Sequence, residues 1–116
     1  MARSKEQELL LARIATELSE IAPVDCGTMF RSPGLRWNGK IIAFLGHDAR
    51  LVVKLPRNRG RELIDAGQAD AVTMGKRTMK EWFAIRASSD SQSTHDNWLG
   101  LAREALEFIR EIEARP

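Results

Sequence analysis

The sequence has few of the features that mark secreted, membrane-spanning or disulfide-bonded chains. Its one cysteine, Cys26, cannot form a disulfide within the chain, and a lone thiol is typical of a reducing compartment. The N-terminus lacks an apolar segment followed by a small-residue cleavage site. No apolar run reaches the roughly 20 residues that a membrane-spanning helix needs. We therefore expect a cytoplasmic protein that makes no membrane contact.

Residues suited to catalysis or metal binding are also scarce. The two histidines, His47 and His95, do not stand with Cys26 at the spacing of a zinc site. A catalytic thiol needs a base within hydrogen-bond reach, and nothing in the spacing places one beside Cys26, so we expect a buried or incidental thiol at a turn. His95 has the character of an ordinary surface residue at a helix start. The glycines match no phosphate-binding loop, and each of Gly34, Gly39 and Gly46 has a turn to explain it. The sequence predicts no enzyme, metal site or cofactor, with an uncharacterised enzyme as the weakest alternative.

The length and composition fit one domain. A chain of 116 residues with 43% hydrophobic residues can bury a single core, whereas two domains would each be too small. We expect residues 1–116 to form that one domain.

The pattern of apolar and turn residues predicts an α+β fold. Leu10, Ile14 and Leu18 recur at helical spacing and predict a first helix over 4–21, capped by Ser4. From about 24 to 55 short apolar runs alternate with turn signals, and Asn38-Gly39 is the pair that a two-residue hairpin turn favours. These runs predict an antiparallel meander with strands around 35–37, 40–45 and 50–55.

The second half of the chain adds helices and one or two strands. A short helix is expected over 58–66, with Asn58 as its cap and Gly67 as its stop, followed by a strand near 71–74. Residues 79–86 suit either a strand or a helical turn. After a polar loop at 87–93, Ser93 or Thr94 caps a final amphipathic helix that runs to the end of the chain. The predicted fold is an antiparallel sheet of about four to six strands packed by the N- and C-terminal helices.

Positive charge is concentrated in one segment. The whole chain has a formal net charge of +2, but residues 31–61 hold eight basic side chains and one acidic one. The basic residues lie on predicted neighbouring strands and the segment that follows them: Arg31, Arg36, Lys40, Arg50, Lys54, Arg57, Arg59 and Arg61. In the strand after Gly46, Arg50, Val52 and Lys54 would point to one face and Leu51, Val53 and Leu55 to the other.

This basic segment has two interpretations. Its side chains could converge on one rim of the sheet and neutralise phosphates of a nucleic acid or groups of an acidic partner. The plainer alternative is a solvated face balanced by acidic helices nearby. No aromatic residue is clearly interleaved with these arginines in the sequence, which argues against a stacking platform for single strands.

The three tryptophans, Trp37, Trp82 and Trp98, are expected as anchors in the core or at its rim. Trp37 stands beside the Asn38-Gly39 turn, and hairpin tips rarely reach a core. A partly exposed Trp37 would mark a protein-binding patch or a homodimer contact.

A series of short motifs spans most of the chain: Met29-Phe30, Gly34, Asn38-Gly39-Lys40, Ala43-Phe44, Leu51-Val52-Val53-Lys54, Gly67 and Leu101-Ala102-Arg103-Glu104-Ala105-Leu106. This series resembles the N-terminal domain of the TfoX (Sxy) family, with its M-F-G-G stretch, G-K turn, F-A pair, L-Y-L-K strand and terminal A-x-x-A-L helix. Here Arg31-Ser32-Pro33 stands where a second glycine is typical, and Val52 replaces the strand tyrosine.

The resemblance implies a compact bacterial α+β domain, related in fold to YjbR-like proteins for which DNA binding has been proposed. TfoX proteins are associated with the regulation of natural competence alongside a transcriptional activator. We therefore expect a binding or regulatory domain, such as an accessory to transcription, whose partner is protein, DNA or both. The main alternative is a protein-interaction or self-associating domain with no role at nucleic acids.

Overall fold

The computed structural model describes residues 5–29, 32–46 and 50–114. Their helices and strands follow one another in the order α1 (Lys5–Leu18), β1 (Val24–Met29), β2 (Ser32–Trp37), β3 (Lys40–Leu45), β4 (Leu51–Lys54), α2 (Arg57–Asp65), β5 (Asp70–Met74), β6 (Arg77–Ile85) and α3 (Ser91–Ala114). No helix in these ranges is long and apolar enough to cross a membrane.

All six strands form one antiparallel sheet in the order β1-β2-β3-β4-β6-β5. The first four strands are a simple meander, as the sequence predicts. The chain then passes through α2 to the far edge, and β6 returns to pair with β4, with Lys54 opposite Trp82. This return places the second half of the chain directly beside the basic segment of the first half.

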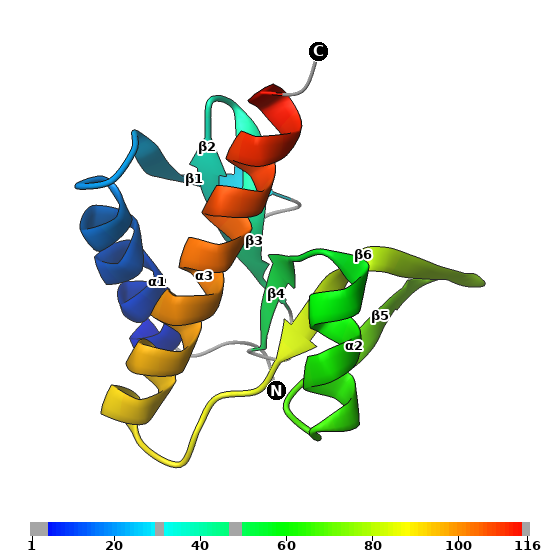
Figure 1. Ribbon diagram of the computed structural model, residues 1–116. Helices are drawn as coiled ribbons and strands as arrows, with labels where there is room; N and C mark the ends of the chain where they lie inside the picture. The colour runs from blue at the N-terminus through cyan, green and yellow to red at the C-terminus, as the bar shows by residue number, and fades with distance from the viewer. Residues whose placement is uncertain (1–4, 30–31, 47–49, 115–116) are drawn as a thin grey trace.

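The three helices cover one face of the sheet. Figure 1 shows α1 and α3 side by side over the sheet, with α2 beside β5 and β6. Gly60 of α2 lies so close to the buried Phe83 ring of β6 that a methyl group at Gly60 would stand 2.0 Å from it. Arg59 of α2 also donates to Glu104 of α3 at 2.8 Å, so all three helices share this side. The expected α+β class, sheet and flanking terminal helices are confirmed.

The core fills the space between the sheet and the helices. From the sheet it takes alternate residues of the central strands, including Leu51, Val53 and, one residue past β4, Leu55, as the strand alternation predicts. From the helices it takes the apolar stripes of α1 and α3, and Trp98 of α3 is fully buried among them. The other face of the sheet is therefore left without a helix in the described part of the chain.

Local turn chemistry agrees with the sequence at two of its clearest signals. Asn38 and Gly39 have φ angles of 53° and 78°, the left-handed values that a two-residue hairpin between β2 and β3 requires. Gly67 has φ 75°, and its N–H and that of Gln68 donate to the carbonyls of Ile64 and Leu63. This pairing is the Schellman end of a helix, so Gly67 ends α2 as predicted.

The end of α1 and the N-terminal caps of α2 and α3 differ from the predictions. α1 ends at Leu18 rather than at residue 21, and its predicted cap, Ser4, lies outside the described residues. α2 begins one residue before the predicted cap, at Arg57, after Pro56, whose fixed φ of −58° leads into the helix without a side-chain cap. In α3 the cap is Asp90, whose carboxylate accepts from the Ser93 backbone N–H at 2.7 Å.

The predicted caps of α3, Ser93 and Thr94, were therefore wrong. Both lie inside the helix, and Thr94 is buried with its hydroxyl donating to the carbonyl of Asp90 at 2.8 Å. The loop after β6 is correspondingly shorter than expected. Residues 79–85 belong to β6, which resolves the strand-or-helix alternative in favour of a strand.

Two glycines lie inside strands rather than at the expected turns. Gly27 of β1 and Gly34 of β2 are paired across the sheet. A Cβ at Gly27 would stand 2.5 Å from Nε of Arg36, and a Cβ at Gly34 would stand 3.3 Å from the Phe44 Cβ. Both glycines make room for neighbouring side chains on the helix-free face. In the sequence, a glycine that is needed for space cannot be distinguished from a glycine at a turn.

Candidate functional site

The helix-free side of the sheet, here called the open face, carries the residues that alternate with the core. In β3 and β4 the buried Ala43, Leu45, Leu51 and Val53 point to the helices, so Phe44 and Lys54 point away from them. Trp82 of β6 lies opposite Lys54 and alternates with the core residue Phe83. The open face is thus built from strands that are far apart in the sequence.

An aromatic cluster formed by Phe44, Lys54 and Trp82 occupies the centre of the open face. The Phe44 and Trp82 rings lie 5.7 Å apart between centroids, inclined at 55°. The Lys54 ammonium stands 5.6 Å from the Trp82 ring centroid, within the range of a cation–π contact. All three side chains are partly exposed. Lys54 makes no ion pair with any described residue, so the cluster has a cation without a carboxylate.

Two ion pairs flank this cluster. On the β1 and β2 side, Nε of Arg36 reaches across Gly27 to Asp25 at 2.9 Å. On the β4, β5 and β6 side, Arg50 donates to Asp70 at 3.1 Å, and Arg86 approaches the same carboxylate at 3.7 Å. The side chains of Asp25 and Asp70 are respectively 69% and 44% exposed, so water reaches both pairs. Exposed pairs of this kind contribute only about 0–1 kcal/mol to stability.

The other basic residues of 31–61 lie elsewhere. Lys40, at the hairpin tip, pairs with Glu113 of α3 at 3.5 Å. Arg59 is held by Glu104 and Glu62, whose carboxylates raise the pKa of its guanidinium, and Arg61 approaches Asp65 at 3.7 Å. Arg57 is exposed on α2 with no ion pair to a described residue. Arg31 lies outside the described residues.

The eight predicted patch residues therefore do not form one surface. Arg36, Arg50 and Lys54 share the open face, whereas Arg57, Arg59 and Arg61 are carried by α2 on the opposite side of the sheet. Of the seven that the structure describes, five have acidic partners. Two of these partners, Glu104 and Glu113, lie on α3, as the plainer interpretation anticipates.

The expectation that no aromatic residue accompanies the basic ones was wrong. Trp82 is 28 positions from Lys54 in the sequence, yet β6 pairs with β4 and makes the two residues direct partners. Phe44 was within the basic segment, but its position next to Trp82 depends on the same crossover. Only a prediction of the strand order could have found the cluster, because no local motif encodes it.

Trp37 lies on the helix side of the hairpin tip. It is half-buried and packs against the core, so it is a partly exposed anchor at the rim, as predicted. With Ile21, whose exposed fraction is 44%, it lines a shallow hollow that also includes Asp25 and Arg110. Asp25 belongs both to this hollow and to the ion pair with Arg36 at the margin of the open face, whereas Trp37 lies on the helix side.

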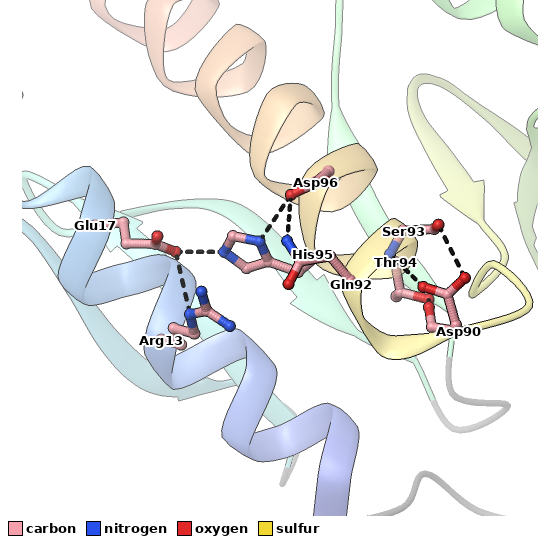
Figure 2. A network of polar contacts seen from close by, with 8 residues as sticks. All are labelled: Arg13, Glu17, Asp90, Gln92, Ser93, Thr94, His95 and Asp96. Carbon is pink, nitrogen blue, oxygen red and sulfur yellow. Dashed lines mark hydrogen bonds and ion pairs between the residues drawn. The ribbon is translucent and has the colours of Figure 1, made fainter.

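His95 is buried, contrary to the expectation of a surface residue. Its exposed fraction is 4%, and Figure 2 shows the ring between α1 and α3. Nε2 lies 2.6 Å from the Glu17 carboxylate, and Nδ1 lies 3.2 Å from that of Asp96. Gln92 donates to Asp96, and Arg13 approaches Glu17 at 3.9 Å. Carboxylates engage both ring nitrogens, so His95 joins two helices, and its ring has no hydrogen bond to a Ser, Thr or Cys side chain in the described part of the chain.

Cys26 lies within β1, at the edge of the sheet, and not at the predicted turn. The residue is exposed, yet packing around its sulfur desolvates the thiolate and, together with the nearby Asp25 charge, raises the pKa of the thiol. A raised pKa leaves less of the nucleophilic thiolate at neutral pH. In the described ranges no group of three or more His, Cys, Asp or Glu side chains is arranged to hold a metal ion.

Comparisons of this chain with models of protein families, with curated proteins and with solved structures find no match.

Proposed function

We propose that this chain is a non-enzymatic, nucleic-acid-binding regulatory domain of the TfoX N-terminal type, acting in the cytoplasm through the open face of its sheet. The observation that carries the proposal is the aromatic cluster, in which Lys54 has no ion pair to a described residue and lies beside two partly exposed rings. The motifs between Met29 and Leu106 support the family assignment. A role as an accessory to transcription follows from that resemblance.

The charges of the open face suit a polyanion. Lys54 stands near its centre, with Arg36 and Arg50 on either side. Each arginine is held by an exposed carboxylate, and phosphate oxygens can compete for such a guanidinium because the existing pair gains little from water-screened attraction. Few cations are involved, so we expect weak binding that is insensitive to sequence and falls with salt at a shallow slope, because the slope scales with the number of phosphates contacted.

The direct test is fluorescence anisotropy of a labelled oligonucleotide titrated with protein at several salt concentrations. The variant Arg36→Ala/Lys54→Ala removes one ion-paired arginine and one cation with no ion pair among the described residues. If both contact phosphates, binding weakens and the slope of log K against log salt falls by about 1.4 for a single strand.

The chain offers a matched control. Arg57→Ala/Arg61→Ala also removes one ion-paired arginine and one cation that pairs with no residue in the described ranges, but from α2 on the other side of the sheet. The proposal predicts near-normal binding for this control. Equal losses in the two double variants would show that net charge alone drives binding, and an absence of binding at low salt would overturn the proposal.

A second candidate function is self-association or another protein contact at the Trp37 hollow. It is favoured by the exposed Ile21 beside the half-buried Trp37, because apolar and aromatic side chains are enriched at the centres of protein interfaces. Gel filtration with light scattering tests the homodimer form. A dimer that Ile21→Asp converts to a monomer would support it, and a monomer at high micromolar concentration would exclude it.

A further inference from the structure

We infer that the nucleic acid bound by the open face is single-stranded, with unpaired bases stacking on Phe44 and Trp82. This inference rests on the proposed function and specifies its ligand. It is based on the aromatic cluster, because binding to phosphates alone does not require partly exposed aromatic rings. Base stacking on aromatic side chains is the common way in which proteins hold single strands without regard to sequence.

The shape of the open face also disfavours a duplex as its main ligand. The major groove of a duplex admits a helix or a two-stranded ribbon, whereas the aromatic cluster lies across three neighbouring strands in the interior of a six-stranded sheet. In a duplex, each base already has its ring faces covered by its neighbours. An unpaired base has a free ring face, and an open sheet surface can accept it.

Lys54 links stacking to phosphate binding. Its ammonium lies over the Trp82 ring, where a base would stack. A cation–π contact at an exposed site is weaker than the stacking of a base on the same ring. A base that stacks on Trp82 would therefore displace the flexible lysine side chain from the ring. The ammonium then remains within reach of the phosphate attached to the stacked nucleotide. Phe44, inclined to Trp82 and not covered by Lys54, offers a second ring surface beside it.

The experiment compares labelled oligonucleotides of about 12 nucleotides, a length within the usual range of single-strand sites. Poly-thymidine and mixed-sequence single strands are titrated beside the corresponding duplex, at one salt concentration. The variants are Phe44→Leu and Trp82→Leu, which keep apolar side chains but remove the rings. Trp37→Leu makes the same change at a half-buried tryptophan away from the open face and serves as the control. Circular dichroism checks that each variant is folded.

The expected result is that single strands bind at least tenfold more tightly than the duplex. Trp82→Leu should weaken single-strand binding about tenfold and leave the weak duplex binding unchanged, while Trp37→Leu has no effect. Duplex binding equal to single-strand binding, unchanged by the ring variants, would overturn the inference and leave the proposed function standing. Single-strand binding that neither Phe44→Leu nor Trp82→Leu weakens would also overturn the inference, because the strand would then bind away from the aromatic cluster. Binding of neither form at low salt would overturn both the inference and the proposed function.

Discussion

His95 of α3 and Glu17 of α1, 78 positions apart in the sequence, are joined by a 2.6 Å contact between the imidazole Nε2 and the carboxylate. The imidazole is almost fully buried, whereas Glu17 is partly exposed and is also approached by Arg13. This contact ties the first helix to the last one over the core. The site on the opposite face of the sheet depends on that packing, because the same strands contribute both faces.

The His95–Glu17 contact should contribute measurably to stability. Replacing His95 by Ala removes a hydrogen bond to a charged group and leaves a cavity between the helices, so we expect a loss of about 2 kcal/mol in the free energy of unfolding. A double-mutant cycle with Glu17→Ala, followed by urea denaturation, measures the pairwise term. We expect a coupling energy of about 1 kcal/mol. Additive effects of the two substitutions on the free energy of unfolding would show that the contact does not contribute to stability.

The close approach of α2 to the sheet predicts opposite effects for two glycine-to-alanine changes. In Gly60→Ala the new methyl group meets the buried Phe83 ring, and overpacking of this kind costs about 1–3 kcal/mol. In Gly100→Ala the methyl group meets nothing within 4 Å on an exposed part of α3, so better helix propensity stabilises by about 0.5–1 kcal/mol. Thermal unfolding of both variants checks the pair. A stabilising Gly60→Ala would contradict the described packing.

Asp90 predicts a pH-dependent contribution from the cap of α3. The backbone N–H of Ser93, and then its hydroxyl, hydrogen-bond the carboxylate and lower its pKa below the ordinary value. A lowered pKa in the folded state means that this stability is present above the unfolded-state pKa and is lost as the pH falls through the folded-state pKa. Asp90→Ala should therefore lower the melting temperature at neutral pH and by less in acid.

The control for this prediction is Asp90→Asn, which keeps a capping oxygen but does not titrate. Its melting temperature should lie near that of the wild type at neutral pH, without the acid-dependent component. The same difference between Asp90→Ala and the wild type at every pH would contradict the assigned role of the carboxylate.

Local chemistry made most of the fold predictable. The Asn38-Gly39 pair, the Gly67 stop and the apolar stripe around Trp98 each correspond to a turn, a helix end or a buried helix face in the structure. The caps were less accurate, because several Ser, Thr and Asp residues near position 90 can all accept from a helix start. Which one does so depends on how the chain leaves β6.

The candidate site was much less predictable. The basic residues could be counted in the sequence, but their distribution over two sides of the molecule follows from α2 packing on the helix face. The aromatic cluster depends on β6 pairing with β4 and not with β5 alone. The burial of His95 likewise depends on α1 and α3 meeting. Each of these is a long-range relationship that spacing along the chain does not encode.

The most direct test of the account is an NMR titration of isotope-labelled protein with a thymidine oligonucleotide. The three tryptophans give separate indole N–H signals: Trp82 on the open face, Trp37 at the hollow and Trp98 in the core. We predict that the Trp82 signal and the backbone amides around Phe44 and Lys54 shift strongly, while those of Trp37, Trp98 and α2 do not. Shifts concentrated on α2 or at the Trp37 hollow, with Trp82 unmoved, would contradict the claim that the open face binds nucleic acid.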